Sequence, residues 1–323
     1  MRKFIFRLLL FLLVPIAGAA FLFIAPYERK FAFNYASSDC DGFNWIFYRI
    51  FENPKPVDVA FIGSSRTGCG IDDKSVSKII SGNKNQTLAA LNFGYCRYGR
   101  NMDYLIVKFL LENKKPRIIV LECTEDDQGG SHLAFPWIAQ TGDLFASTLL
   151  INEKYVSDIL GGLESRIRQM RETILKTHRD SLPNPEKGDF QYIEAPLFGD
   201  SLELITESRK SQEKNPGLES NQPSADWSNN PSNWFTVNYL RCIQRLALEH
   251  NVKIFFLYMP SFGHGKVKPS ALHFYPKIGE VWIPPDSIFN RLDYRRDYVH
   301  LNERGGDALA KWLAPRIATE LTK

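Results

Sequence analysis

The sequence lacks the features that most directly reveal a metal-binding or nucleic-acid-binding protein. Its five cysteines are odd in number and widely spaced, and no C-x-x-C or H-x-x-x-H pair occurs, so we expect no metal and no bound cofactor. The 40 basic and 36 acidic residues are interspersed, so no basic face indicates a nucleic-acid partner. Internal repeats are also absent. What remains is an ordinary globular composition, 44% hydrophobic over 323 residues, which is enough for a large core.

Charge is missing from one long run near the N-terminus, from Leu8 to Ala25. At about 1.5 Å per residue, a helix of this length approaches the roughly 30 Å of a bilayer core. The basic residues Arg2, Lys3 and Arg7 precede the run, and this excess of positive charge predicts a cytoplasmic N-terminus with the remaining chain across the membrane. The sequence therefore predicts a single-pass membrane protein whose main domain is extracytoplasmic, in the periplasm or at the cell surface.

A cleaved signal peptide is the competing interpretation of the same segment. The small residues "AGAA" at 17–20 fit a peptidase site. However, the apolar run continues through "FLFIA", which makes it longer than a typical signal core. We therefore favour an uncleaved transmembrane anchor at 1–30, followed by a juxtamembrane segment at 31–56.

The cysteines have to be considered in that compartment, where disulfides are permitted. Cys69, Cys96 and Cys123 each lie just after a predicted strand, so they could meet on one rim of a sheet as a disulfide or, with less support, as a metal site. We favour the simpler interpretation that they are buried thiols packing as small hydrophobic residues. The remaining two cysteines are Cys40 and Cys242.

Apolar runs rich in β-branched and aromatic residues alternate with helical patterns from residue 57 onward. The predicted strands are "VDVAFIG", "TLAALNFG", "PRIIVLEC" and "VKIFFLYMP". Between them, "DKSVSKIISG", "NMDYLIVKFLLENK" and "WFTVNYLRCIQRLALEHN" carry apolar residues at helical spacing. Continuous apolar strands separated by helices predict a parallel sheet covered on both faces, in a doubly wound α/β domain at 57–323. Ligands of such sheets bind beyond the carboxyl ends of the strands.

The region at about 125–233 interrupts this alternation. Its first half reads as helices, and its second half is polar and rich in Pro, Asn and Ser. We interpret it as an insertion into the α/β domain, either a lid or polymer-binding surface beside the site or an idle surface segment.

Two short polar motifs lie at opposite ends of the domain. The first strand breaks into "GSSR", which places Ser65 at the carboxyl edge of the sheet, and "DYVHLN" near the C-terminus holds Asp297 and His300 in a D-x-x-H arrangement. On a tight loop this spacing lets the carboxylate bond to Nδ1–H of the histidine while Nε2 faces outward to accept a proton. A serine hydroxyl near Nε2 then becomes a nucleophile. The structural alternatives are a helix N-cap for Ser65 and a pair that closes the last helix for Asp297 and His300.

Taken together, "GSS" after the first strand, "NFGYCRYG" after the second and "DYVHLN" before the last helix resemble the motifs of the SGNH (GDSL-like) hydrolase superfamily. The resemblance implies a flavodoxin-like three-layer fold. It also implies a catalytic triad with Ser65 as nucleophile and with Asp297 and His300 as the other two members. Gly99 is the best match to the family's oxyanion glycine and Gly94 is the second. The backbone N–H groups of Gly99 and Ser65 would then point at the developing oxyanion.

The block after the third strand departs from the family pattern. Where the family carries G-x-N-D, this chain reads "VLECTEDD", so Thr124, Glu125 and Asp126 occupy the region and no asparagine is available. A carboxylate cannot donate the hydrogen bond that an asparagine amide gives to an oxyanion. Loss of one such donor typically costs about a hundredfold or more in rate. In this respect the chain is similar to the divergent, membrane-anchored members of the superfamily, including those that accompany acyltransferases in acetylating exopolysaccharides and cell-wall polymers.

Other polar and aromatic residues of the predicted loops are interpreted as structural. We expect Arg66 to bond to the carbonyl ends of neighbouring strands rather than to an acidic group of a substrate. We expect His132, His264 and His273 at the surface rather than as ligands. The aromatic residues of "AFPWIAQ" and "HFYPKIGEVWIPP" are expected to pack within loops rather than to form a sugar-stacking platform.

Two functions from different classes follow. The first is that of a serine ester hydrolase or O-acyltransferase acting on acyl esters of an envelope polysaccharide or related glycan, with a membrane acyltransferase as a candidate partner. The second is that of a catalytically inactive SGNH-like scaffold in a polysaccharide modification or assembly complex, for which the missing asparagine is the motive.

Overall fold

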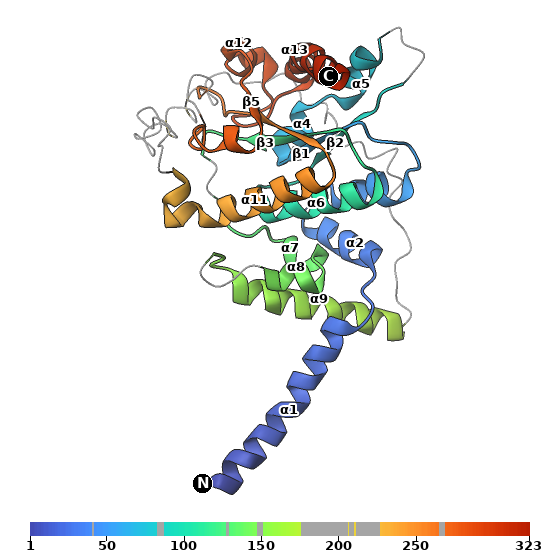
Figure 1. Cartoon of the computed structure of the whole chain (residues 1–323), viewed down its shortest axis with the longest axis vertical. Helices are drawn as coiled ribbons and strands as arrows, with labels where there is room; N and C mark the ends of the chain where they lie inside the picture. Colours follow the sequence, from blue (N-terminus) through green and yellow to red (C-terminus); the bar gives the residue numbers. More distant parts are fainter. Residues whose placement is uncertain are drawn as a thin grey trace.

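A five-stranded, all-parallel sheet forms the centre of the α/β domain (Figure 1). The computed structural model describes residues 1–40, 42–82, 87–126, 129–146, 151–175, 206, 210, 227–264 and 269–323. Its strands are β1 (Val59–Gly63), β2 (Ala90–Gly94), β3 (Ile118–Cys123), β4 (Lys253–Tyr258) and β5 (Glu280–Trp282), in the order β2-β1-β3-β4-β5. The first four are the strands that the apolar runs predict.

Helices cover both faces of the sheet, as continuous apolar strands require. On one side lie α5 (Asp73–Ser81), α12 (Asp286–Phe289) and α13 (Glu303–Thr322); on the other lie α6 (Arg100–Asn113) and α11 (Trp234–Glu249) (Figure 1). The side chains of β1 divide accordingly. Val59 and Phe61 belong to the core beneath α13, and Ala60 and Ile62 belong to the core beneath α6 and α11.

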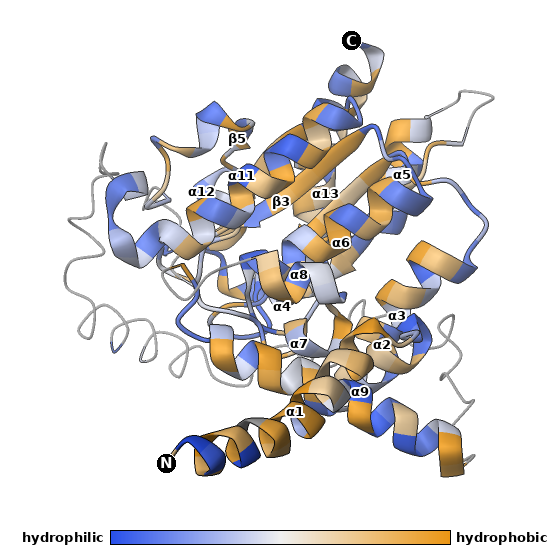
Figure 2. Cartoon of the chain, turned by 60° about the horizontal axis from the view of Figure 1, so that its bottom comes forward, coloured by the Kyte–Doolittle hydropathy of each residue, from blue (hydrophilic) through white to orange (hydrophobic). Residues whose placement is uncertain are grey.

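The N-terminal helix α1 (Arg2–Ile24) extends away from the domain and is mostly apolar (Figures 1 and 2). An 18-residue window of it has a mean hydropathy of 2.4 and is not buried against the rest of the chain, so the helix is long and apolar enough to cross a membrane. The juxtamembrane segment is not a simple connection. It forms α2 (Arg29–Asp39), α3 (Phe43–Phe47) and a π-helical turn η1 (Tyr48–Glu52), and Phe33 of α2 packs on Phe109 of α6.

Between β3 and α11 the described residues form helices and turns and no strand of the sheet. This region contains α7 (Phe135–Ile138), α8 (Thr141–Ala146), α9 (Tyr155–Leu175) and two 3-10 turns, η2 (Trp227–Asn229) and η3 (Pro231–Asn233). The helices α7 to α9 lie at the base of the domain, beside α2 and the end of α1 (Figure 1). Of the polar second half of the predicted insertion, the structure describes residues 206, 210 and 227–233, and the rest lies outside the described residues.

Strand β5 is missing from the sequence-based expectations because three residues are too few to show a periodicity. It comes from the aromatic stretch "HFYPKIGEVWIPP", which we expect to pack rather than to bind sugar. The described rings do pack inward: Trp282 stacks on Phe255 with ring centroids 4.2 Å apart, and Tyr275, in the 3-10 turn η4 (Tyr275–Lys277), stacks on Phe256 at 4.4 Å.

Candidate active site

In the turn after β1, the residue that caps the next helix and the candidate nucleophile are two different serines. Ser64 is the N-cap of the short helix α4 (Ser65–Gly70), and its hydroxyl accepts a hydrogen bond from Arg66 N at 3.2 Å. Ser65 is therefore the first helical residue and not the cap, which leaves its side chain available for another partner. In the described part of the chain its backbone N–H also makes no hydrogen bond, so that group is free to act on a ligand.

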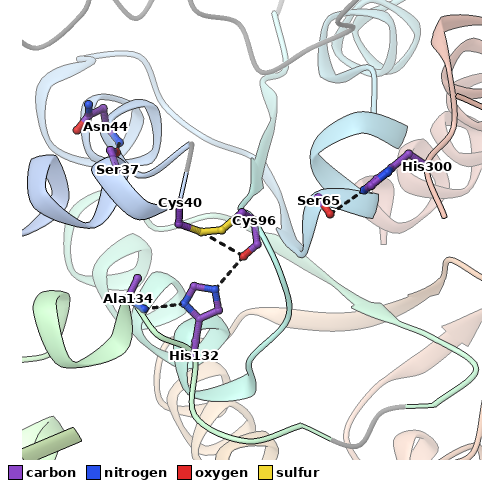
Figure 3. The surroundings of a disulfide bond; sticks show 8 residues. All are labelled: Ser37, Cys40, Asn44, Ser65, Cys96, His132, Ala134 and His300. Atoms are coloured by element: carbon purple, nitrogen blue, oxygen red, sulfur yellow. Dashed lines mark hydrogen bonds between the residues drawn. A yellow bond between two sulfur atoms is a disulfide. The ribbon is translucent and has the colours of Figure 1, made fainter. Parts of the chain in front are cut away.

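The partner of Ser65 comes from the other end of the chain. His300 Nε2 lies 2.8 Å from Ser65 Oγ (Figure 3), and His300 Nδ1 lies 2.8 Å from Asp297 Oδ2 and 3.0 Å from Oδ1. The three side chains thus form one hydrogen-bonded chain from carboxylate to imidazole to hydroxyl. With Nδ1–H donating to Asp297, the lone pair of Nε2 faces the hydroxyl and can accept its proton.

A tight loop between the 3-10 turn η5 (Leu292–Tyr294) and α13 sets the geometry of Asp297 and His300. Asp297 Oδ1 accepts hydrogen bonds from the backbone N–H groups of Val299 and His300 at 2.9 and 2.8 Å, and Arg296 N donates to the His300 carbonyl. The carboxylate therefore orders the loop that carries its own histidine. The three-residue spacing of the motif is the spacing that such a loop needs.

Two further residues anchor this loop to the domain. The buried guanidinium of Arg295 donates to the carbonyls of Phe289, Val299 and Pro260, and burial lowers its pKa to about 9. Asn302, two residues after His300 in the "HLN" stretch, caps α13 by accepting from Gly305 N. Its amide donates back to the carbonyls of Asp293 and Arg295, and those bonds fasten both ends of the loop.

Asp297 is held in its ionised form. Partial burial opposes ionisation, but the hydrogen bonds and the charge of His300, together with the two backbone N–H groups, outweigh it and lower the pKa of Asp297 to about 2. A carboxylate that stays charged can stabilise an imidazolium on His300 whenever the histidine takes a proton.

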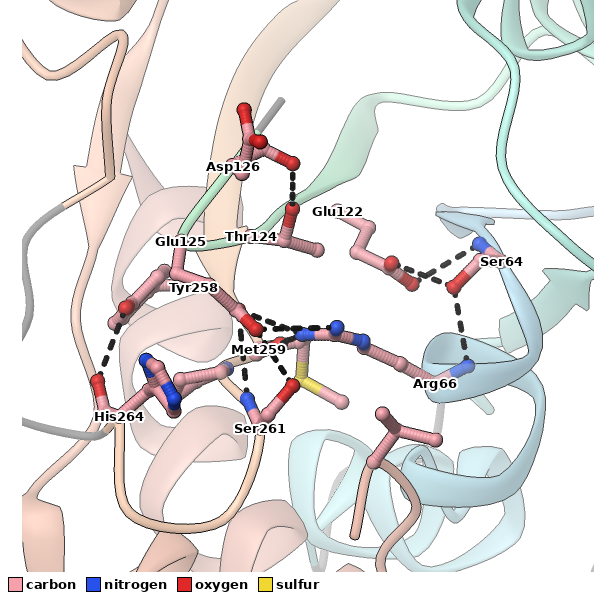
Figure 4. Close-up of polar contacts among 12 residues, drawn as sticks. Ser64, Arg66, Glu122, Thr124, Glu125, Asp126, Tyr258, Met259, Ser261 and His264 are labelled. Atoms are coloured by element: carbon pink, nitrogen blue, oxygen red, sulfur yellow. Dashed lines mark hydrogen bonds and ion pairs between the residues drawn. The ribbon is translucent and has the colours of Figure 1, made fainter. Parts of the chain in front are cut away.

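A buried carboxylate from β3 holds the serine turn from below. Glu122 accepts from Ser64 twice, with Oε2 bonded to the backbone N–H at 3.0 Å and Oε1 bonded to the hydroxyl at 2.6 Å (Figure 4). Oε2 also accepts from the backbone N–H of Thr67 at 3.0 Å and from its hydroxyl at 2.6 Å. Glu122 is not among the sequence-predicted site residues, although a single acidic residue in an otherwise apolar predicted strand is a signal for such a role. A β-carbon on Gly63 would lie 2.4 Å from Glu122 Cβ, which explains the glycine that opens "GSSR".

Arg66 has the structural role that we expect for it. Its guanidinium donates to the carbonyl of Met259, which follows β4, and forms a two-pronged pair with Glu125, which follows β3 (Figure 4). Ser261 also donates to Glu125 at 2.5 Å. Burial alone would raise the pKa of Glu125, but the charge and hydrogen bonds of Arg66 prevail and lower it to about 2. This pair ties the ends of three strands together beneath α4.

In the block after β3 that lacks the asparagine, the polar side chains of Thr124 and Glu125 have partners within the protein. Glu125 faces Arg66 and Ser261, and the Thr124 hydroxyl donates to the carbonyl of Asp126 at 2.7 Å. Among the described residues, these contacts leave no side-chain donor in the block to replace the amide that the SGNH pattern carries.

The two candidate oxyanion glycines occupy different environments. Gly94 ends β2 so close to α4 that a β-carbon would lie 2.2 Å from Gly68 N, so it is a packing glycine. Gly99 is the N-cap of α6 and packs against His132, and its carbonyl accepts from the Tyr95 hydroxyl. No hydrogen bond joins Gly99 to Ser65 or His300 in the described part of the chain, and its oxyanion role stays a prediction.

The cysteines pair differently from the arrangement considered above. Cys40, at the end of α2, forms a disulfide with Cys96 in the loop after β2 (Figure 3). Neither Cys69 nor Cys123 belongs to a disulfide in the described part of the chain. The expectation of unpaired buried thiols is therefore wrong for Cys96. Pairing depends on α2 folding back over the sheet, which strand positions alone do not reveal.

Two of the three loop histidines are buried, contrary to expectation. His132 Nε2 bonds to the Cys96 carbonyl and its Nδ1 accepts from Ala134 N, and burial lowers its pKa to about 4, so the ring is neutral (Figure 3). His264 is buried with its ring edge-on to Tyr298, whereas His273 is exposed as expected.

Within the described residues, one set of metal-ligand side chains comes together: Cys40, Cys96 and His132, whose ligand atoms lie within 4.8 Å of one another. The two sulfurs are joined to each other and both ring nitrogens of His132 are hydrogen-bonded, so these residues do not fit a metal ion.

Comparison with known proteins adds no relative to this picture. The chain matches no protein-family model, and no curated protein matches it significantly. The case for a function therefore depends on the geometry of the described residues.

Proposed function

We propose that this chain is a membrane-anchored, extracytoplasmic serine enzyme of the SGNH type, an esterase or O-acyltransferase acting on acyl esters of an envelope polysaccharide or related glycan. One observation carries the proposal: Ser65, His300 and Asp297 form a continuous hydrogen-bonded chain with both contacts at 2.8 Å. That chain joins residues 235 positions apart, and its order is the one that activates a serine.

The chemistry follows from these positions. Ser65 Oγ attacks the ester carbonyl carbon while its proton moves to His300 Nε2, and Asp297 stabilises the imidazolium. The tetrahedral oxyanion accepts a hydrogen bond from the N–H of Ser65 and, as the SGNH resemblance implies, from that of Gly99. Collapse expels the alcohol, which takes the proton from His300 and leaves an acyl-serine. Water then releases a carboxylic acid, or a positioned sugar hydroxyl receives the acyl group.

The topology supports the SGNH assignment. The serine turn follows β1, and the D-x-x-H loop lies just before the last helix, so both motifs meet at the carboxyl edge of a parallel sheet. Together with helices on both faces, this arrangement is what a flavodoxin-like, doubly wound three-layer domain would have. The proposed chemistry needs no metal and no cofactor.

The proposed location is outside the cytoplasm, with α1 as the anchor. The apolar length of α1 and its basic N-terminal residues support this orientation. The Cys40–Cys96 disulfide supports it independently, because disulfides persist in oxidising compartments and are rare in the cytosol. A membrane-embedded acyltransferase would be a suitable partner and donor of acyl groups there.

A non-catalytic scaffold is the second candidate, and one observation favours it. The described residues that directly follow β3, Thr124, Glu125 and Asp126, carry no side-chain amide, and Glu125 is engaged by Arg66 and Ser261. An oxyanion hole with fewer donors would be about a hundredfold or more slower than a complete one.

Hydrolysis of p-nitrophenyl acetate by the full chain in detergent separates these two functions. We expect measurable turnover that falls to background in Ser65→Ala and His300→Ala, and that falls roughly 10²–10⁴-fold in Asp297→Asn because the amide favours the wrong imidazole tautomer. His273→Ala, which removes an exposed histidine outside the triad, is the matched control and should retain parental activity. Equal inactivity of all folded variants and the parent would favour the scaffold.

A further inference from the structure

Helix α9 carries an apolar stripe that the domain does not cover. Its inner side packs on the domain, but six of its large apolar side chains are between 47% and 66% exposed. One is Leu175 at the end of the helix, and the other five form the stripe: Val156, Leu160, Ile167, Met170 and Ile174. Their spacing of three, four or seven residues places them on one side of the helix, with half-buried Leu163 completing the row. Exposed polar residues form a separate flank: Ser157, Glu164, Arg168 and Arg171. A stripe of this kind marks an interaction surface.

The stripe borders the end of α1. On α9, Arg166 lies with its guanidinium 4.9 Å from the ring of Phe23 and 4.6 Å from that of Tyr27, and Ser165 Oγ bonds to the Tyr27 hydroxyl. Leu163 precedes Arg166 by three residues and Met170 follows it by four, so both are its neighbours on the helix surface. The side of α9 that meets α1 therefore continues directly into the apolar stripe.

Residues typical of a membrane interface lie around the contact between α1 and α9. Tyr27 donates to the carbonyl of Trp137, Tyr35 stacks on the Trp137 ring at 4.0 Å, and the half-exposed Arg168 covers both rings. Phe145 of α8 is 47% exposed and packs on Phe23. Tyr and Trp side chains concentrate where a spanning helix leaves the hydrocarbon, and long basic side chains reach from there into the headgroup region.

We infer that α9 lies flat in the interface of the phospholipid bilayer that α1 spans, with its apolar stripe among the acyl chains and Arg168 and Arg171 among the headgroups. The inference depends on α1 being a membrane anchor but not on the ester chemistry. Because α9 touches the last turn of α1 and crosses it at the base of the domain (Figure 1), a bilayer around α1 would reach it. Amphipathic helices with basic flanks bind anionic bilayer surfaces in this way.

Nitroxide accessibility in the full chain tests this placement. The half-exposed Cys69 and Cys242 are replaced by serine, and a spin label is attached through Leu160→Cys or Ile167→Cys. The protein is reconstituted in nanodiscs of phosphatidylcholine and phosphatidylglycerol, and the collision rates with oxygen, which partitions into lipid, and with aqueous nickel-EDDA are compared.

Two controls calibrate the result: Leu13→Cys in α1 reports the bilayer, and Lys311→Cys on the exposed surface of α13 reports water. We expect the oxygen-to-nickel ratio at Leu160 and Ile167 to exceed that at Lys311 several-fold. An aqueous ratio at both positions, with a bilayer ratio at Leu13, overturns the inference and leaves the anchor intact. An aqueous ratio at Leu13 overturns both. Spectral broadening between labels on two chains would assign the stripe to a second copy and also overturn the inference.

Discussion

Replacement of Glu122 tests the claim that a buried carboxylate holds the nucleophile's turn in place. The carboxylate accepts four hydrogen bonds, all from Ser64 and Thr67, the residues on either side of the Ser65–Arg66 pair. At about 1 kcal/mol per bond, Glu122→Ala should lower the free energy of unfolding by about 4 kcal/mol, because four donors lose their acceptor. In Glu122→Gln an amide oxygen can still serve the three donors at the Oε2 position, so the expected loss is about 1–2 kcal/mol.

Activity should follow the position of the turn. We expect Glu122→Gln to lower kcat for p-nitrophenyl acetate about tenfold or more, with little change in KM, because Ser65 shifts relative to His300 while it remains in the site. Glu122→Ala should lose more. Urea unfolding and steady-state kinetics of the full chain in detergent measure the two effects on the same samples.

Thr67→Val provides the matched control, since it removes the one hydroxyl donor at 2.6 Å from Glu122 Oε2 and keeps the shape of the side chain. Its effect should be about 1 kcal/mol, and Thr67→Val combined with Glu122→Ala should cost less than the sum of the two single effects. If both Glu122 variants matched the parent in stability and kcat, or if the double variant were strictly additive, the carboxylate would not hold the turn.

Three further predictions concern an ion pair, a disulfide and a glycine that support the site or the domain around it. The pKa of Glu125 is lowered from 4.5 to about 2, so its ion pair with Arg66 stabilises the fold above pH 4.5, and this stabilisation is lost as the pH falls toward 2. Between pH 5 and pH 2 the unfolding free energy of the parent should therefore fall by about 3 kcal/mol more than that of Glu125→Gln, as measured by urea titrations at each pH. The Cys40–Cys96 disulfide closes a separation of 56 residues, so the double Cys→Ala variant should unfold with about 2–4 kcal/mol less free energy, and equal stability under oxidising conditions would contradict the pairing. Gly63→Ala places a methyl group 2.4 Å from Glu122 Cβ and should lower kcat and thermal stability together; an unchanged melting temperature would refute the close approach.

Local patterns in the sequence were sufficient to predict the first four strands of the sheet and helices that cover it. The predicted helix "NMDYLIVKFLLENK" appears as α6 at Arg100–Asn113, and four apolar runs appear as four parallel strands. These elements are specified by residues close together in the chain, because periodicity reports which face is buried. The D-x-x-H motif was legible for the same reason: Asp297 bonds to the backbone of the loop that carries His300.

The supports of the site depend on contacts between distant segments, which a single sequence does not display. Glu122 meets Ser64 only because β3 lies beside β1 in the sheet, and Cys40 meets Cys96 only because α2 folds onto the loop after β2. The burial of His132 against that loop has the same origin. Such pairings are set by topology, and strand order cannot be read from periodicity.

Labelling by a fluorophosphonate probe tests the central claim most directly, because the probe reacts only with a serine whose hydroxyl is activated. The account predicts that mass spectrometry of the labelled full chain places the adduct on Ser65. It also predicts that Ser65→Ala abolishes labelling, that His300→Ala slows it strongly, and that His273→Ala leaves it unchanged. An unlabelled Ser65 in the folded parent, or labelling at an equal rate in His300→Ala, would contradict the triad.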